Sequence, residues 1–394
     1  MVKNLYIRSE RIYFENGIKS GILEIEDGKF KSFIIDKKEV KGEIIDYGKN
    51  RIIPGIIDVH NHGFFGWSLT EGATKDVIKG YLKALPYCGV TGVFPTAVDN
   101  VFGVIADVMD EDYDGARILG IHSEGPFFNR SGENGKESIF PKPTIEAAEK
   151  IWDESKGKLR YMSFAPEVEG AYEVAQFLRE KGVIVAAAHT NATAKQMFDA
   201  IKHGFIVATH TGNAMRGIHH REIGALGAVL LDPDIYNELI SDFIHISPDM
   251  IRIMFRLKDY NKFLLISDSS PLAGAKPGVY KLFGKMITVE ENGLVHDEYG
   301  RIFGSSKCVL YGIGNLVEKL NIPLEKVIVM ASLIPAKIFG IENRKGSIKE
   351  GKDADFVVVD DSYNSIATYV EGKLVYSITS EQNFFNRDFL MLNH

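Results

Sequence analysis

Histidines and acidic residues recur in this sequence directly after short apolar runs, where metal ligands could gather. The run Asp58-Val59-His60-Asn61-His62 places two histidines two residues apart, so that on a strand both imidazoles point to the same side. Imidazole and carboxylate ligands suit Zn²⁺, and also Fe²⁺ or Mn²⁺. No cysteine belongs to the set, which excludes a thiolate site. The candidate ligands are His60, His62, Glu124, His189 and His210.

Asp268 is a candidate for acid–base chemistry because it follows the apolar run Phe263–Ile266. A carboxylate is costly to bury there unless it is paired or lies near a metal ion. A helix N-cap or a structural salt bridge is about as good an interpretation of Asp268 taken alone. Single histidines at strand ends are also more often structural than catalytic. The metal interpretation gains its weight from several such residues following different strands.

The middle of the chain alternates apolar β-type runs with segments of helical periodicity, such as Thr74–Pro86, Ala171–Lys181 and Ala194–His203. About eight strands, nearly all apolar, predict a (β/α)8 barrel of the TIM type, with a doubly wound open sheet as the alternative. In a barrel, the carboxyl ends of all strands meet on one face, where catalysis occurs. The expected strands are Ile53–Val59, Val90–Val98, Ile118–His122, Tyr161–Ala165, Val183–Ala188, Ile206–Thr209, Ile240–His245 and Phe263–Ser267.

Both ends of the chain read as short strands joined by turns. Asn16-Gly17 and Asp27-Gly28 are turn dipeptides near the start, and Glu371-Gly372 is a turn near the end. These ends predict a small β-sandwich domain built from both termini. The expected boundaries are 1–52 plus 344–394 for this domain and 53–343 for the barrel, with the tail 380–394 left unplaced.

Composition narrows the class of protein. The 394 residues are 45% hydrophobic and 25% charged, with a net charge of −7 and no basic cluster, so a nucleic-acid partner is not expected. Two cysteines, Cys88 and Cys308, form no disulfide framework. Residues 1–10 lack the apolar core of a secretory signal, and no run approaches a membrane span. We therefore expect a cytoplasmic protein without a membrane partner.

Several motifs together resemble one enzyme family along nearly the whole chain. They are Pro54–Gly63, Gly120–Phe127 with its Glu-Gly-Pro, His189–Thr193, His210–Met215, His220–Gly224, Ala331–Ala336 and Gly346–Asp355. This set resembles the N-acetylglucosamine-6-phosphate deacetylases of the amidohydrolase superfamily. The last two motifs are shared widely in the superfamily and say little about the substrate, whereas the Glu-Gly-Pro, Asn-Ala-Met and Arg-Glu elements are specific.

The resemblance implies roles for individual residues. Glu124, His189 and His210 match the family's main metal ligands, and His60 with His62 matches a second metal position that only some members keep. One or two divalent ions are therefore expected, Zn²⁺ first and Fe²⁺ or Mn²⁺ as alternatives. The matches outside the metal positions are Asp268 to the catalytic aspartate, Arg221 and His245 to residues that bind the substrate phosphate, and Asn213 and Ala214 to backbone donors near that phosphate.

The implied function is removal of the acetyl group from an N-acetylhexosamine 6-phosphate, most simply N-acetylglucosamine 6-phosphate, by a homodimer in which Arg221 reaches the neighbouring subunit's site. One departure affects the sugar. Family members carry a histidine in the loop after Glu-Gly-Pro, but residues 128–142 contain none, and Lys136 or Glu137 falls near its place. We expect one of these two to contact the sugar instead, although the loop could equally be a surface excursion.

Two alternatives to this function remain from the sequence. One is a related amidohydrolase that acts on a cyclic amide or another acylated amine, which the presence of Arg221 and His245 disfavours. The other is a barrel that has lost catalysis and serves in binding or assembly. That second alternative predicts degraded metal ligands, whereas all five are present.

Overall fold

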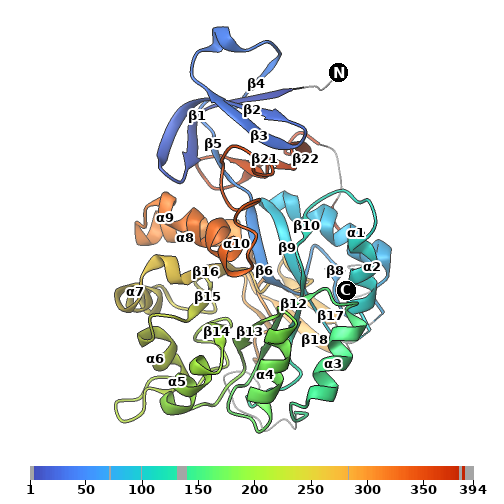
Figure 1. Cartoon of the computed structure of the whole chain (residues 1–394), viewed down its shortest axis with the longest axis vertical. Coiled ribbons are helices and arrows are strands. Elements are labelled where there is room, and N and C mark those ends of the chain that lie inside the picture. Colours follow the sequence, from blue (N-terminus) through green and yellow to red (C-terminus); the bar gives the residue numbers. More distant parts are fainter. Residues whose placement is uncertain are drawn as a thin grey trace.

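The computed structural model describes residues 4–70, 72–98, 100–130, 140–282, 284–380 and 384–386. Figure 1 shows two parts, a β domain at the top and a larger barrel with surrounding helices below it. The first and last segments of the chain lie side by side in the β domain, because β5 pairs antiparallel with β20 through partners such as Ile53 and Val357.

The larger part is a parallel barrel of eight strands. Successive strands are hydrogen-bonded in the order β6, β9, β11, β12, β13, β14, β15, β16. The ring is completed where the Asp268 N–H donates to His60 O at 2.9 Å and the His62 N–H donates to Ser269 O at 3.0 Å. The predicted barrel is therefore confirmed and the open sheet is wrong. The strands are β6 Ile56–Asn61, β9 Val90–Ala97, β11 Ile121–Glu124, β12 Leu159–Phe164, β13 Ile184–Ala187, β14 Phe205–Ala208, β15 Tyr236–Ile240 and β16 Phe263–Ile266.

Helices flank these strands and cover their outer side (Figure 1). Their apolar residues are buried against the strands, as for Ile78, Tyr81 and Leu82 of α1. Threonine N-caps fix several starts, and Thr193 forms a full capping box with Gln196 at the start of α5. The helices are α1 Lys75–Ala84, α2 Phe102–Met109, α3 Ile145–Glu154, α4 Ala171–Glu180, α5 Ala194–Lys202, α6 Gly224–Leu231, α7 Pro248–Leu257, α8 Val309–Leu320, α9 Leu324–Ile328 and α10 Ile334–Ile338.

Both chain ends form the small β domain, as predicted. Its strands make one eight-stranded sheet in the order β22-β21-β20-β5-β1-β2-β3, with β4 paired to β1. The boundaries expected for the two domains stay a prediction, although β5 already belongs to this sheet and ends at Pro54. The strands are β1 Leu5–Phe14, β2 Gly17–Glu26, β3 Lys29–Ile34, β4 Ile44–Asp46, β5 Arg51–Pro54, β20 Phe356–Val359, β21 Ser365–Val370 and β22 Lys373–Ser377.

Three strand predictions were wrong in position. The expected strand Ile53–Val59 is two strands, β5 in the small domain and β6 in the barrel. The expected strand Ile118–His122 is divided into β10, Arg117–Ile118, and β11. The seventh barrel strand is Tyr236–Ile240 rather than Ile240–His245. It contains the polar residues Asn237 and Glu238, which an apolar-run criterion passes over although both are buried.

An additional three-stranded sheet, not predicted from the sequence, lies between the eighth barrel strand and α8. It consists of β17 Gly278–Leu282, β18 Lys285–Val289 and β19 Val295–Asp297, paired antiparallel in that order. Residues Leu272, Tyr280 and Ile287 belong to its own small apolar core. The segment that leaves this sheet returns to the carboxyl end of the barrel at Ser305.

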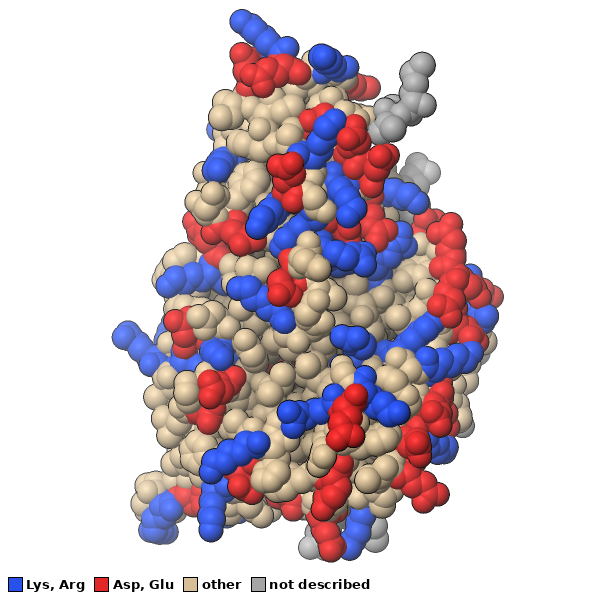
Figure 2. All heavy atoms as spheres, viewed as in Figure 1, with Lys and Arg blue, Asp and Glu red and all other residues tan. Residues whose placement is uncertain are grey.

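Charges of both signs are interspersed on the face of the molecule shown in Figure 2, over the small domain as well as over the barrel. On that face the blue and red side chains alternate, with uncharged surface between them, so neither sign forms a continuous band there. Within the described ranges, no helix is both long and apolar enough to cross a membrane.

Candidate metal centre and its cavity

Six polar side chains from five different barrel strands meet at the carboxyl face. His60 lies in β6, and His62 follows that strand by one residue. Glu124 is the last residue of β11. The others follow their strands by two residues: His189 after β13, His210 after β14 and Asp268 after β16. The structure thus brings together all five candidate ligands and the candidate acid–base residue.

Glu124, His189 and His210 form one cluster that could hold a metal ion. Glu124 Oε1 lies 3.0 Å from His189 Nε2 and 3.0 Å from His210 Nε2, and the two Nε2 atoms are 3.3 Å apart. The other ring nitrogen of His189 is 2.9 Å from the carbonyl oxygen of Arg130. That contact fixes a proton on Nδ1 and leaves the Nε2 lone pair directed at the cluster.

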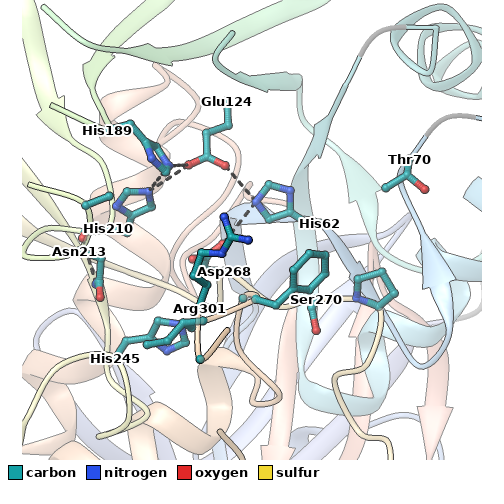
Figure 3. A pocket seen from close by; sticks show the side chains of 16 residues that line it. His62, Thr70, Glu124, His189, His210, Asn213, His245, Asp268, Ser270 and Arg301 are labelled. Atoms are coloured by element: carbon teal, nitrogen blue, oxygen red, sulfur yellow. Dashed lines mark hydrogen bonds and ion pairs between the residues drawn. The ribbon is translucent and has the colours of Figure 1, made fainter. Parts of the chain in front are cut away.

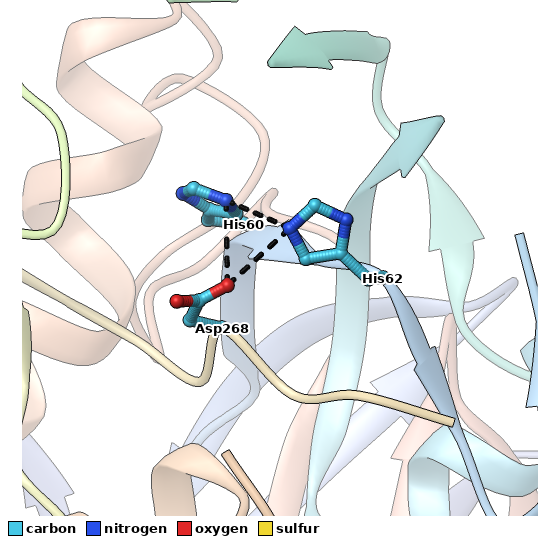
Figure 4. A group of neighbouring side chains, drawn as sticks. All are labelled: His60, His62 and Asp268. Atoms are coloured by element: carbon cyan, nitrogen blue, oxygen red, sulfur yellow. Dashed lines mark hydrogen bonds and ion pairs between the residues drawn. The ribbon is translucent and has the colours of Figure 1, made fainter. Parts of the chain in front are cut away.

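His60, His62 and Asp268 form a second cluster, shown in Figure 4. The two Nε2 atoms are 3.2 Å apart. Asp268 Oδ1 lies 3.5 Å from His60 Nε2 and 3.3 Å from His62 Nε2. Asp268 therefore lies among the candidate ligands themselves, although the prediction from the sequence assigned it only an acid–base role.

Glu124 connects the two clusters, because its two oxygens face different groups (Figure 3). Oε1 contacts the histidines of its own cluster, whereas Oε2 lies 3.2 Å from His62 Nε2 and 3.5 Å from His60 Nε2. A carboxylate placed in this way can bind one ion through each oxygen. The two clusters therefore share Glu124, an arrangement that would allow one or two ions to be held.

The donor atoms fit a transition-metal ion. Nitrogen ligands at about 2.1 Å in a tetrahedral arrangement are separated by about 3.3 Å. The separations in the Glu124 cluster are 3.0, 3.0 and 3.3 Å, and those in the Asp268 cluster are 3.2, 3.3 and 3.5 Å. The backbone is also strained at three donors, with φ of +47° at His189, +30° at His210 and +48° at Asp268. Such strain is typical of functional sites.

The charged groups of the two clusters shift one another's pKa values when no ion is bound. Burial lowers the pKa of His62, but hydrogen bonds with Asp268 and Glu124 outweigh it and raise that pKa to about 9. Burial raises the pKa of Asp268, but His60 and His62 outweigh it and lower that pKa to about 2. At neutral pH a proton on His62 therefore compensates the carboxylates, and a bound cation would take over this compensation and release the proton.

Sequence reasoning missed Glu238, which is fully buried in β15. One of its oxygens lies 3.1 Å from His60 Nδ1 and accepts a 2.9 Å hydrogen bond from the His210 N–H. The other oxygen accepts a 2.7 Å hydrogen bond from Tyr161. Glu238 thus orients His60 so that Nε2 faces the cluster, and it also holds the backbone of His210. The signal was a glutamate between Asn237 and the apolar pair Leu239-Ile240, which periodicity alone does not separate from a strand end.

We expect the Glu238→Gln variant to bind the ion of the His60 cluster about 10- to 100-fold more weakly, because outer partners of ligating histidines contribute on that scale. Elemental analysis after dialysis against a weak chelator measures the loss. Tyr161→Phe is the matched control, since it removes a hydrogen bond from Glu238 and leaves the His60 contact. Equal metal content in Glu238→Gln and wild type would show that Glu238 only fills space.

The clusters open into a cavity of about 410 Å³, the size of a small-molecule site. Its walls combine the cluster residues with Thr70, Asn213, Ala214, His245, Ser270, Pro271 and the segment 300–304 (Figure 3). Arg221 does not line the cavity of its own chain and is exposed, with Nη1 2.8 Å from His220 Nε2. Lys136 and Glu137 lie outside the described residues, so their predicted contact with the sugar stays a prediction.

His245 is a basic residue that lines the cavity and belongs to neither cluster. Its Nδ1 is 2.8 Å from Asp242 Oδ2, and its own backbone N–H donates to Asp242 Oδ1 at 2.9 Å. Burial lowers the pKa of His245, but the bond to Asp242 outweighs it, so that pKa lies above its ordinary value. His245 Nε2 is buried and has no hydrogen-bond partner among the described residues. His245 therefore borders the cavity with one ring nitrogen that no described residue engages.

Asn213 and Ala214 lie at the same wall, in the turn after β14. The Asn213 backbone N–H already donates to His210 O at 2.9 Å, and its side-chain amide donates to the same oxygen at 3.1 Å. Ala214 adopts a left-handed conformation with φ of +47°. The turn is thus built around the metal ligand His210, which places the backbone of Ala214 against the cavity.

Comparison with known proteins agrees with this geometry. Residues 51–375 match the model of the amidohydrolase family. The N-acetylglucosamine-6-phosphate deacetylase of Bacillus subtilis (strain 168) is 32% identical, covering 95% of this chain and 98% of that protein. The N-acetylgalactosamine-6-phosphate deacetylase of Escherichia coli O157:H7 is 29% identical, covering 93% of this chain and 98% of that protein.

Among solved structures, the crystal structure of the N-acetylglucosamine-6-phosphate deacetylase from Pasteurella multocida superimposes with a TM-score of 0.86, at 26% identity over 94% of this chain and 99% of that one. Its fold extends over both the barrel and the small β domain, because the matched share leaves out little of either chain. The chain belongs to the amidohydrolase family and, within it, to the N-acetylglucosamine-6-phosphate deacetylases.

Proposed function

We propose that this enzyme hydrolyses the acetamide of an N-acetylhexosamine 6-phosphate, with N-acetylglucosamine 6-phosphate as its first substrate, and releases acetate and the amino-sugar phosphate. The observation that carries the proposal is the pair of clusters bridged by Glu124 at the floor of a sugar-sized cavity. The named activities of the relatives support the same reaction. Intact ligands disfavour the alternative of a barrel without catalysis.

The two clusters would hold one or two divalent ions, Zn²⁺ first, with Fe²⁺ or Mn²⁺ as alternatives. When bound, such an ion polarises the amide carbonyl and lowers the pKa of water from about 16 to about 7. His189, His210 and Glu124 would hold the first ion, and His60 and His62 the second.

Asp268 would carry the proton through the reaction. Its pKa of about 2 makes it a carboxylate at neutral pH, so it can accept a proton from the water that attacks the acetamide carbonyl. The same carboxyl group then gives that proton to the nitrogen, because an amide nitrogen leaves only after it is protonated. Its place beside both clusters puts it within reach of both steps.

The phosphate would bind at the His245 side of the cavity. The ring of His245 would offer its free Nε2, and Ala214 would offer its backbone N–H, whereas the backbone N–H of Asn213 already donates to His210 O. Arg221 is exposed in its own chain, which supports the proposal that it serves the neighbouring subunit of a homodimer. Arginine suits this role because its planar fork pairs with phosphate oxygens.

Phosphate binding should weaken at high pH. The pKa of His245 lies above its ordinary value of 6.5, so the imidazolium persists to a higher pH than in an ordinary histidine and is lost as the pH rises through the raised value. We expect KM for the phosphorylated sugar to rise on that alkaline side. Asp242→Asn removes the main group that raises the pKa and leaves the burial that lowers it, so the rise should begin at a lower pH. Profiles of KM against pH for both proteins test this, and identical profiles would contradict it.

A panel of four sugars tests the proposed function. Acetate release is measured from N-acetylglucosamine and N-acetylgalactosamine, each with and without a 6-phosphate. We expect the phosphorylated forms to be strongly preferred, and the glucosamine epimer to have the higher kcat/KM. A preference for the galactosamine epimer would move the protein toward its Escherichia coli relative. No release from any of the four would contradict the proposal.

A further inference from the structure

A single arginine, Arg301, borders the cavity from the segment that leaves β19, and neither the sequence motifs nor the clusters account for it. Three hydrogen bonds hold this segment in place. The Asp297 N–H donates to Arg301 O at 2.9 Å, the Ser305 N–H donates to Asp268 O at 2.7 Å, and Ser305 Oγ donates to Asp242 Oδ2 at 2.8 Å. The segment that carries Arg301 is therefore tied, through Ser305, to the acid–base residue Asp268 and to Asp242, the partner of His245.

Hydrogen bonds to described residues hold the guanidinium of Arg301 at its Nε edge, and its Cζ also lies 5.3 Å from the ring centroid of Tyr299. Its Nε donates to Asp297 Oδ2 at 3.0 Å, and Asp297 is nearly buried at the end of β19. No described residue accepts a hydrogen bond from its two Nη atoms, and no second carboxylate in the described ranges lies within ion-pair distance. Figure 3 shows the guanidinium at the cavity, in front of Asp268. A fork fixed at Nε presents its outer edge to a planar or tetrahedral anion.

The charged residues of the cavity indicate which kind of ligand the outer edge of the Arg301 guanidinium binds. Outside the two clusters, Arg301 and His245 are the basic residues among the described lining. The carboxylates of Glu124 and Asp268 are already engaged by histidines. A sugar 6-phosphate brings close to two negative charges near neutral pH, with acceptor oxygens that match both donors.

We propose that Arg301 binds the substrate phosphate from within the same subunit, opposite His245, through its two Nη atoms. The inference rests on the proposed function and deepens it, because it assigns a phosphate-recognising residue that does not depend on a neighbouring subunit. Selectivity for phosphorylated sugars is then set by the β17–β19 sheet, which positions Arg301 through Asp297. It also follows that the phosphate site is formed in part before any dimer assembles.

The test compares Arg301→Ala with wild type on N-acetylglucosamine with and without its 6-phosphate. Loss of two charge-assisted hydrogen bonds should lower kcat/KM for the phosphorylated sugar by about 10- to 100-fold. The unphosphorylated sugar should change by less than about 2-fold, since that donor edge has nothing to bind there. Arg301→Lys should recover only part of the loss, because lysine keeps the charge without the fork. Arg252→Ala, an exposed arginine on α7, is the control for the change in net charge.

Equal losses on both sugars, or no loss on either, would overturn the role of Arg301. Calorimetric binding of glucosamine 6-phosphate to wild type and Arg301→Ala gives a readout that does not depend on turnover. If wild type releases no acetate, the proposed function fails, while weaker binding by Arg301→Ala would still support the phosphate contact. Arg221→Ala measured beside it separates the two arginines: a loss confined to Arg221→Ala would place phosphate recognition across the subunits and contradict the inference.

Discussion

Asp268→Asn is expected to lose about 100- to 10,000-fold in kcat, the range that general acid–base groups contribute. The amide is similar in size and keeps an oxygen at the position of Oδ1, but it cannot accept and return a proton. The ion held by Glu124, His189 and His210 should remain, because Asp268 is not in that cluster. Rates of acetate release and elemental analysis on the same preparation measure both properties.

Two results would separate catalysis from structure at this position. Asp249→Asn, an exposed aspartate in the first turn of α7, should behave as wild type and controls for the substitution itself. If Asp268→Asn keeps more than about half the wild-type rate, Asp268 only anchors the histidines of the second cluster.

His189→Ala should lose the ion of the Glu124 cluster and, with it, more than about 100-fold of the activity. Changes in the partners of ligating histidines already cost about 10- to 100-fold, and removal of a ligand should cost more. Phe128, whose ring centroid is 4.2 Å from that of His189, borders the vacated position and offers no ligand atom of its own. Elemental analysis gives the metal content per chain.

The control for this variant is His203→Ala. His203 is half exposed at the end of α5, stacks on Tyr172 and belongs to neither cluster. It should keep wild-type metal content and rate. Full metal occupancy in His189→Ala would show that His189 is not a ligand, and the Glu124 cluster could then no longer be assigned as a metal site.

Much of the site could be predicted from the sequence because its main residues follow apolar runs. His60 and His62 share a side of one strand, and Glu124, His189 and His210 end others, so the barrel rule was enough to bring them together. The rule worked because it needs only the position of each residue relative to a strand end, which an apolar run indicates directly.

The residues that hold this set in place could not be predicted in the same way. Glu238 lies inside a strand, and its burial is compensated by His60 and Tyr161, contacts that exist only after folding. Its presence also displaced the seventh predicted strand by several residues. The position of Arg301 depends on the β17–β19 sheet. The strands of this sheet are short, contain charged residues and are separated by turns, so the sequence shows no clear alternation of apolar and polar residues there. Asp242 is recognisable only beside His245.

We propose that divalent ions bound in these clusters allow the chain to deacetylate N-acetylglucosamine 6-phosphate. The direct measurement is acetate release by protein stripped with a chelator and then titrated with Zn²⁺, with metal content followed in each sample. The stripped protein should be inactive, and the rate should return in proportion to added ion until it reaches a plateau at one or two ions per chain. An undiminished rate in protein free of metal, or no acetate release after full reloading, would contradict this proposal.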